Sequence, residues 1–294
     1  MQTQPLPKLS VTDVLYSRQV WIYNLTFVVS GSDQLNDKCF LYTWNEAESG
    51  RGPNEICSAL IDFLEKLEYN LLNSGKSVPT TLNLFSDSCS AQNKNQYTMM
   101  ILLHYINYKS KVFKNINHFF PVRGHSYMPP DRVFGRIEKE LNKKETIFSP
   151  QEYCTVFEKY ATVNIYNKDF NVFVYKTSIK TIVKSKNDFK STQQKVFTYI
   201  KGEHTVEIFK TYGGLLDKIE VVKRNGKLLS MTDNLIQLPK TNHLKLPKQK
   251  DVKNLVRFFE VPQHGKQFYE DIFQNSGNDE GPDENIALYE SDDD

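Results

Sequence analysis

The sequence predicts an α/β fold with a mixed sheet flanked by helices, because segments of strand character alternate with amphipathic helices after an opening pair of strands. The opening pair, 19–29 and 38–44, is rich in β-branched and aromatic residues, and turn-forming residues separate its two members. Apolar residues then recur at helical spacing in 51–68. This order is typical of a sheet that begins with a hairpin and continues through strand–helix units.

The segments up to residue 160 continue this alternation. Short apolar runs at 80–85 and 115–122 are typical of buried strands. Helical apolar spacing predicts helices at about 90–108, 131–141 and 150–160. Beyond residue 160 most segments favour strands, and Asn225 and Gly226 form a hairpin signal.

The predicted organisation has three parts that differ in charge. They are an α/β domain over 1–160, a basic strand-rich subdomain with a terminal helix over 161–275, and an acidic disordered tail over 276–294. Nineteen Lys and Arg oppose eight Asp and Glu in 161–259, whereas the tail holds eight acids and no Lys or Arg. The basic part favours a polyanionic partner such as DNA; the alternative is that its lysines only solvate a β-rich surface.

Composition argues against several classes of protein. The four cysteines include no C-x-x-C pair, which argues against a zinc finger and against a disulfide scaffold. No apolar run is long enough to span a bilayer, and the first ten residues lack the apolar core of a signal peptide. We therefore expect an intracellular protein without a membrane partner.

Three acidic residues fall at the ends of predicted elements. Asp87 follows the strand 80–85, and Glu55 and Asp131 lie in the first turns of predicted helices. Ligands usually bind at the carboxyl ends of strands in open α/β sheets, and converging carboxylates can hold two Mg²⁺ or Mn²⁺ ions about 4 Å apart. Alternatively, Glu55 and Asp131 complement helix dipoles and Asp87 caps the next helix. The residues alone leave both interpretations open.

Other polar residues lie near the same predicted strand and helix ends. His125 follows the predicted strand 115–122, where it is either a structural histidine or a donor near a scissile phosphate. Amide-bearing and basic side chains follow Asp87 and precede His125. We expect five of them to lie near the metal or the substrate backbone: Gln92, Asn93, Lys94, Asn95 and Arg123.

Several blocks of the sequence resemble a eukaryotic domain family of unknown function that occurs in transposon-derived open reading frames. The blocks are WNEAESGRGPNE at 44–55, SDSCSAQNKNQY at 86–97 and VRGHSYMPPDRVFGRIE at 122–138. The resemblance extends to about residue 275 in the same motif order. In layout that family is similar to ribonuclease H-like transposases and integrases of the aspartate-aspartate-glutamate/aspartate type, which implies a ribonuclease H-like sheet.

This resemblance also implies roles for particular carboxylates. Asp87 matches the fourth-strand carboxylate of the ribonuclease H-like fold, Asp131 matches the acid of the last catalytic helix, and Glu55 matches the optional acid of the first helix. Glu138 is a further candidate metal ligand on the same helix face as Asp131. The implied activity is nuclease or transposase chemistry on DNA with two Mg²⁺ or Mn²⁺ ions and no small-molecule cofactor. The resemblance also implies a nuclear location, and it does not decide whether the chain forms an oligomer.

The family pattern includes one strand that this sequence lacks. Relatives have a strand ending in Asp just before the segment matched by 1–10, and this chain begins there with Met1. In a ribonuclease H-like sheet that strand is central, between the hairpin and the strand of Asp87. Its absence leaves backbone groups unpaired, at about 1–3 kcal/mol for each buried group. We therefore expect either a longer natural protein or a decayed copy that does not cleave DNA.

The alternative function is a domesticated, non-catalytic module that binds nucleic acid or a protein partner through 161–259. Lysines mixed with aromatic residues can neutralise phosphates and stack on bases. The aromatic candidates are Phe197, Tyr199, Phe209 and Tyr212. Aromatic residues of this kind are more often part of a hydrophobic core.

Overall fold

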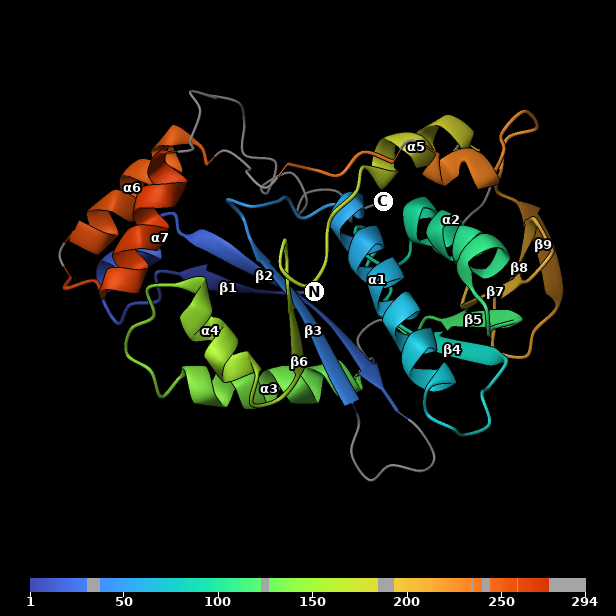
Figure 1. Cartoon of the computed structure of the whole chain (residues 1–294), viewed down its shortest axis with the longest axis horizontal. Helices are drawn as coiled ribbons and strands as arrows, with labels where there is room; N and C mark the ends of the chain where they lie inside the picture. Colours follow the sequence, from blue (N-terminus) through green and yellow to red (C-terminus); the bar gives the residue numbers. More distant parts are fainter. Residues whose placement is uncertain are drawn as a thin grey trace. The chain divides into compact units, whose positions relative to one another are not determined.

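The structure is a computed structural model that describes residues 1–30, 38–122, 127–184, 193–233, 235–239, 244–257 and 259–274. The chain divides into two compact units, each made of separated segments of sequence (Figure 1). Unit 1 comprises Met1–Arg51, Met128–Asp169 and Pro239–Asp294, and unit 2 comprises Gly52–Tyr127 and Phe170–Leu238. These units differ from the predicted ranges 1–160 and 161–275: each unit combines residues from both ranges, and the predicted boundary at residue 160 lies inside the second segment of unit 1. None of the helices in the described ranges is long and apolar enough to cross a membrane.

Unit 1 contains a four-stranded sheet in the order β1–β2–β3–β6. Its strands are β1 (Gln2–Leu6), β2 (Val20–Val29), β3 (Lys38–Asn45) and β6 (Thr162–Ile165). The pairs β1–β2 and β2–β3 are antiparallel, and β6 is parallel to β3. The predicted hairpin is present as β2 and β3. Strand β1 is not predicted, because its Pro5 disfavours a strand; β1 lies at the sheet edge, where a missing N–H is tolerated.

Helices complete the core of unit 1. They are the 3-10 helix η1 (Thr12–Tyr16) and the α-helices α3 (Pro129–Leu141), α4 (Pro150–Phe157), α6 (Leu246–Arg257) and α7 (Gln263–Gln274). Buried apolar residues of three strands and all four α-helices form one cluster, which includes Leu6, Ile22, Leu41, Ile137, Tyr153, Val252 and Tyr269. This shared core holds together segments of unit 1 that are far apart in sequence.

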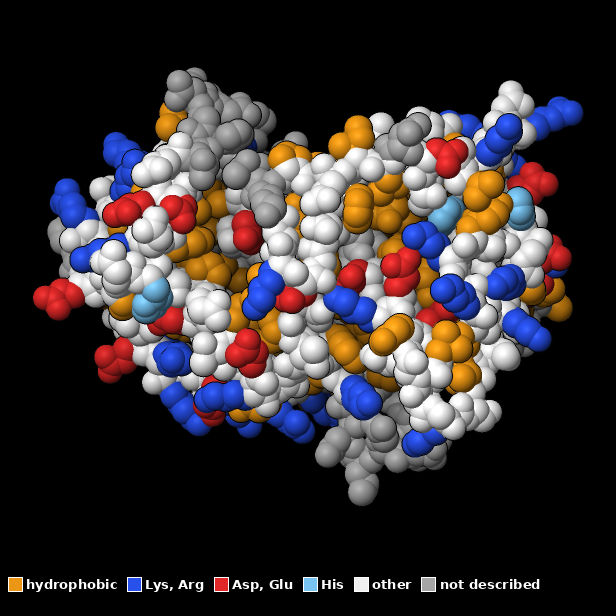
Figure 2. All heavy atoms as spheres, in the orientation of Figure 1, with side chains coloured by type: hydrophobic (Ala, Val, Ile, Leu, Met, Phe, Trp, Pro, Cys, Tyr) orange, Lys and Arg blue, Asp and Glu red, His pale blue; other side chains and the backbone are white. Residues whose placement is uncertain are grey.

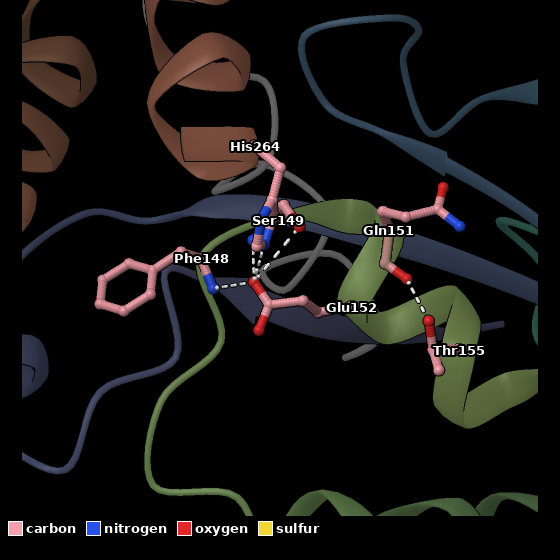
Figure 3. Close-up of polar contacts among 6 residues, drawn as sticks. All are labelled: Phe148, Ser149, Gln151, Glu152, Thr155 and His264. Atoms are coloured by element: carbon pink, nitrogen blue, oxygen red, sulfur yellow. Dashed lines mark hydrogen bonds and ion pairs between the residues drawn. The ribbon is translucent and has the colours of Figure 1, made fainter. Parts of the chain in front are cut away.

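Glu152 joins two helices of unit 1 (Figure 3). It lies in the first turn of α4, where its Oε1 atom accepts hydrogen bonds from the backbone N–H groups of Phe148 and Ser149 at 3.0 and 3.1 Å. His264 Nε2, at the start of α7, lies 3.1 Å from the same oxygen. One carboxylate therefore caps α4 and holds the start of α7 beside it.

Unit 2 contains a five-stranded sheet in the order β4–β5–β7–β8–β9. Its strands are β4 (Thr81–Phe85), β5 (Asn115–Phe119), β7 (Val196–Ile200), β8 (Thr205–Phe209) and β9 (Leu216–Glu220). β4 and β5 are parallel, and the other neighbouring pairs are antiparallel. We predicted one sheet that contains both the hairpin and the strand of Asp87. Among the described strands these lie in different sheets, because β1 and β6 pair with the hairpin edges and β5 pairs with β4.

One face of the unit 2 sheet is covered and the other is open. The helices are α1 (Pro53–Leu72), α2 (Gln96–His104), its π-helical extension η2 (Tyr105–Lys109), α5 (Tyr175–Ile182) and the 3-10 helix η5 (Leu229–Thr232). Helix α2 contacts α1, α5 and β7. The covered face contributes buried side chains that include Ile116, Phe197, Tyr199 and Val206. On the opposite face most side chains are half-buried or exposed.

The hairpin predicted at Asn225 and Gly226 is wrong. The N–H of Gly226 donates to the carbonyl of Lys223 at 2.8 Å, which closes a turn. Strand β9 ends at Glu220, before this turn, and Val222 makes only an isolated bridge, to Val183. In the described chain no strand returns after the turn, because η5 follows it. Asn225 and Gly226 therefore do form a turn, but the residues after the turn enter the 3-10 helix η5 instead of a second strand.

Candidate functional site

The polar segment after β4 forms a hydrogen-bonded turn at the carboxyl ends of the parallel strands β4 and β5. Asp87 lies two residues beyond β4 and is half-buried. Its Oδ1 atom accepts hydrogen bonds from the backbone N–H of Cys89 at 3.2 Å and from Nδ2 of Asn93 at 2.6 Å. The carboxylate therefore fixes the path of the chain between the strand and the next helix.

Asn95 begins helix α2 as its N-cap. Its Oδ1 atom accepts hydrogen bonds from the N–H groups of Tyr97 and Thr98 at 2.9 and 3.0 Å, and its Nδ2 atom donates to the carbonyl of Ser90 at 2.9 Å. This arrangement satisfies two N–H groups that have no partner within the helix. The side chains of Asn95 and Asn93, which we expected near substrate, thus also hold the turn together.

Two further residues expected near substrate are buried in unit 2. Lys94 is 4% exposed, and its Nζ atom lies 5.0 Å from the centre of the Phe120 ring, in a cation–π contact. Gln92 is also buried, and its backbone carbonyl accepts a hydrogen bond from Oγ1 of Thr98 at 3.1 Å. Both side chains therefore lie beneath the surface formed by the turn.

His118 lies at the end of β5 and is paired with the turn after β4. Its Nε2 atom is 2.7 Å from Oγ of Ser86. Burial, and then the positive charge of Lys94, lower the pKa of His118 to about 3, so the imidazole is neutral at physiological pH. Sequence analysis missed this pair. The pair could have been found only from the parallel pairing of β4 and β5, which places Ser86, just after β4, beside His118 near the end of β5.

Glu55 lies in the first turn of α1 and is buried. Its Oε2 atom accepts a hydrogen bond from the N–H of Gly52, the N-cap residue, at 2.8 Å. This contact is the side-chain half of a capping box, which the sequence analysis did not predict; the alternative stated there is that Glu55 complements the dipole of this helix. The optional metal-ligand role of Glu55 stays a prediction.

Asp131 occupies the equivalent place in α3 of unit 1. Its Oδ2 atom accepts a hydrogen bond from the N–H of Met128 at 2.7 Å, and the residue is exposed. Glu138, seven residues further along the same helix, is also exposed. Asp131 therefore caps its helix from the first turn, where the alternative interpretation has it complement the helix dipole.

Neither unit contains the whole predicted set of carboxylates. Asp87 and Glu55 belong to unit 2, whereas Asp131 and Glu138 belong to unit 1. Within the described ranges, no group of three or more His, Cys, Asp and Glu side chains could hold a metal ion. The shared metal site thus stays a prediction that rests on the resemblance.

Two predicted site residues, Arg123 and His125, lie outside the described residues. Their expected contacts with the substrate and with a scissile phosphate stay predictions. The described chain resumes at Tyr127, whose side chain is exposed.

The four aromatic residues considered for base stacking divide into two groups. Phe197 and Tyr199 are buried on the covered face of the unit 2 sheet, so they belong to its core. Phe209 is half-buried on the open face, and Tyr212 is exposed, with its hydroxyl donating to the carbonyl of Phe120 at 2.7 Å. Two of the four therefore have aromatic surface that a ligand can reach.

Comparison with known proteins identifies the family of the chain. The model of the family described as "Domain of unknown function (DUF7869)" matches residues 23–213, which is more than half of the sequence and includes parts of both units. No curated protein and no solved structure matches the chain. The chain therefore belongs to the DUF7869 family.

Proposed function

We propose that the chain binds nucleic acid through unit 2. The observation that carries the proposal is the charge of this unit, whose two segments hold nineteen Lys and Arg against eleven Asp and Glu. Unit 1, including the acidic end of the chain, holds eighteen Lys and Arg against twenty-four Asp and Glu. On the visible surface of unit 2, Lys and Arg side chains are spread among hydrophobic ones (Figure 2). A nuclear location is the expectation that follows from this role.

Phosphate neutralisation is the physical basis of the proposal. Each lysine that contacts a phosphate releases a condensed counterion, so the logarithm of the binding constant falls linearly with the logarithm of salt concentration. Lys195 and Lys210 are suited to this role, because neither forms an ion pair with a described residue. They flank β7 and β8 at one end of the sheet, where the N–H of Lys195 donates to the carbonyl of Phe209 at 2.7 Å.

Fluorescence anisotropy of the full chain with a labelled 15-nucleotide DNA, between 50 and 200 mM salt, tests this function. We expect binding that weakens steeply with salt, and a flatter slope, by about 1.4, for the double variant Lys195→Glu/Lys210→Glu. Lys250→Glu is the matched control, because Lys250 is exposed on α6 of unit 1. Absence of binding, or an affinity insensitive to salt, would overturn the proposal.

A second candidate is Mg²⁺-dependent cleavage of DNA by a transposon-derived, ribonuclease H-like site. Asp87 favours it, because this carboxylate lies at the carboxyl ends of two adjacent parallel strands and its Oδ2 atom makes no hydrogen bond with a described residue. One free carboxylate oxygen does not make a two-ion site, however, and the described residues supply no cluster around it. We therefore derive no catalytic step from it.

A nicking assay on labelled DNA in Mg²⁺ tests the second candidate. If Asp87 takes part in cleavage, the wild-type chain nicks DNA and Asp87→Ala does not, while the two proteins bind DNA equally well. If neither protein nicks DNA, or if both do so at the same rate, Asp87 has no part in a cleavage mechanism.

A further inference from the structure

We propose that the open face of the unit 2 sheet is a stacking platform for the unpaired bases of single-stranded nucleic acid. This inference rests on the nucleic-acid binding proposed above and names both the surface and the form of the ligand. It depends on three features of this end of unit 2: a row of aromatic and apolar side chains on the open face, a neighbouring row of amides and a hydroxyl, and two lysines at the end of the sheet that form no ion pair with a described residue.

The first feature is an apolar row that crosses all five strands. The strand registers align Phe85, Phe119, Val196, Phe209 and Leu216. Phe85, on the edge strand β4, is 64% exposed, and its ring stacks on that of Phe119 with centroids 4.9 Å apart and planes 15° apart. Phe119 and Phe209 are half-buried, and Leu216 is exposed. Val196, on the middle strand β7, is buried, so the row presents aromatic surface to solvent on β4, β5 and β8.

Phe85, at 64% exposure, contributes little to a hydrophobic core. A row of partly exposed aromatic and apolar side chains on one face of a sheet is typical of a binding surface. Because the Phe85 and Phe119 rings are stacked on one another, a base would continue the stack on the ring face of Phe85 that is turned away from Phe119. Bases stack on such faces whatever their identity, since every base has a π-face.

The second feature is a polar row directly beside the apolar one. The registers align Asn83, Asn117, Thr198, Glu207 and Lys218 across the sheet. Nδ2 of Asn117 donates to Oδ1 of Asn83 at 3.0 Å, and Oγ1 of Thr198 donates to Oδ1 of Asn117 at 2.9 Å. Lys218 and Glu207 form an ion pair at 3.1 Å. A polar row through the middle of the face disfavours an apolar helix as its occupant and suits the polar edges of bases.

The third feature is the charge at the end of the sheet where the apolar row lies. Lys195 directly precedes Val196 and Lys210 directly follows Phe209, so both lysines lie at the strand ends beside the row. Because side chains alternate between the faces of a strand, these lysines start from the opposite face and reach a bound strand only around the end of the sheet. Lys218 and Lys184 are instead engaged by Glu207 and Glu220. Positive charge that no described carboxylate neutralises therefore lies at the end of the apolar row, while the middle of the face is close to neutral. A strand with its bases on the rings would place its phosphates toward these lysines.

Single strands suit this surface better than duplexes or a second copy of the chain. In a duplex the faces of the bases are stacked inside the helix and cannot contact a sheet surface. A second copy would bring together two units that each carry a surplus of positive charge. Single-stranded DNA and RNA share the base faces that the platform would use, so both are probed.

The experiment measures anisotropy of the full chain with labelled 15-nucleotide DNA and RNA, an abasic DNA of equal length and a 15-base-pair duplex. We expect Phe85→Ala and Phe209→Ala each to weaken binding to DNA and RNA single strands about tenfold and to leave binding to the abasic strand unchanged. Phe85→Trp should retain wild-type affinity, because it keeps an aromatic face. Tyr69→Ala is the matched control, because Tyr69 is 70% exposed on α1, away from the sheet. Thermal unfolding verifies that each variant is folded.

Several outcomes would overturn the platform, and they separate it from the proposed function. Equal weakening with the normal and abasic strands, or no effect of Phe85→Ala on either, would leave phosphate binding intact and remove base stacking. Tighter binding of the duplex than of the single strand would do the same. A dimer in sedimentation that Phe85→Ala dissociates, without any change in DNA affinity, would assign the face to self-association. Absence of binding to every probe would overturn both proposals.

Discussion

The central strands of unit 1 are buried along most of their length, whereas the edge strands of unit 2 are not. In β2 and β3, Tyr23, Tyr42 and Trp44 are almost fully buried. In β4, exposed residues alternate with half-buried ones. The sequence carries this difference: VWIYNLTFVV is nearly continuously apolar, and TLNLF alternates. The comparison teaches that β2 and β3 of unit 1 serve a core, while β4 and β9 of unit 2 also form a surface.

Buried charges differ between the units in the same way. Unit 1 neutralises a buried lysine with a carboxylate: Nζ of Lys248 lies 2.5 Å from Oε1 of Glu46, and both side chains are almost fully buried. In unit 2, the buried Lys94 lies over an aromatic ring, next to a histidine that burial keeps neutral. Substitutions of buried residues in the two units should therefore change the free energy of unfolding, and its dependence on pH, in different ways.

The largest expected effect is in unit 1, at the buried ion pair. Lys248→Ala removes the lysine that pairs with the buried Glu46 carboxylate, while the N–H of Trp21 still donates to Oε2 at 3.2 Å. We expect the free energy of unfolding to fall by about 3–5 kcal/mol. Chemical denaturation measures it, with Lys250→Ala, at an exposed site on the same helix, as the control that should change it by less than about 0.5 kcal/mol. Equal losses in the two variants would show that the pair is not a determinant of stability.

The second prediction compares the two faces of the unit 2 sheet. Phe197→Ala removes a ring that is 1% exposed, and should lower the free energy of unfolding by about 3–5 kcal/mol. Phe85→Ala removes a ring that is largely in solvent, and should lower it by less than about 1 kcal/mol. The same denaturation experiment measures both. Similar losses would mean that the open face is packed in solution and would contradict the difference between the faces.

The third prediction is that acidification affects the two units in opposite directions. In unit 2, burial, and then Lys94, lower the pKa of His118 to about 3, and burial, and then Lys109, lower the pKa of His104 to about 4. In unit 1, burial raises the pKa of Glu48 to about 7. A depressed histidine pKa contributes stability above the unfolded value of 6.5 that is lost as pH falls. A raised carboxyl pKa contributes stability below 4.5 that is lost as pH rises through 7.

Hydrogen exchange of amides in each unit, corrected for intrinsic rates, measures this effect between pH 7 and pH 5. His118 alone should cost unit 2 about 2 kcal/mol at pH 5. His118→Gln should flatten the response of unit 2, and Glu48→Gln should flatten that of unit 1. His204→Gln, at an exposed histidine of unit 2, is the control. Parallel responses of both units to pH would contradict the assignment.

Much of the fold could be predicted, because its elements carry local signals. The hairpin of β2 and β3 and the long helix α1 follow from strand composition and helical apolar spacing. The division into two sheets did not follow, since strand partners are chosen by contacts between distant segments. Strand β6 pairs with β3 across more than a hundred residues, and no local pattern records that pairing. The discontinuous units have the same cause.

The candidate site was harder to predict, because one residue type serves two purposes at a helix start. Acids in the first turn, such as Glu55 and Asp131, have the same spacing whether they cap a helix or hold a metal. The hydrogen bonds to Gly52 and Met128 establish the capping contacts. The alternation of apolar and polar residues in β4 predicts a strand with one solvent-exposed face. The apolar row across the five strands could not be predicted, because it depends on the strand order, which no local pattern in the sequence indicates.

The smallest expected effect concerns the cap of α2, where the opening turn of the site meets its helix. Asn95→Ala removes the acceptor for the N–H groups of Tyr97 and Thr98 and should lower the free energy of unfolding by about 1 kcal/mol. Asn95→Asp keeps an acceptor at the same place and should retain stability, although it loses the donor to Ser90. Thermal denaturation of both variants measures this effect. If Asn95→Ala abolished nucleic-acid binding with no loss of stability, Asn95 would contact the ligand, and its role as a structural cap would be wrong.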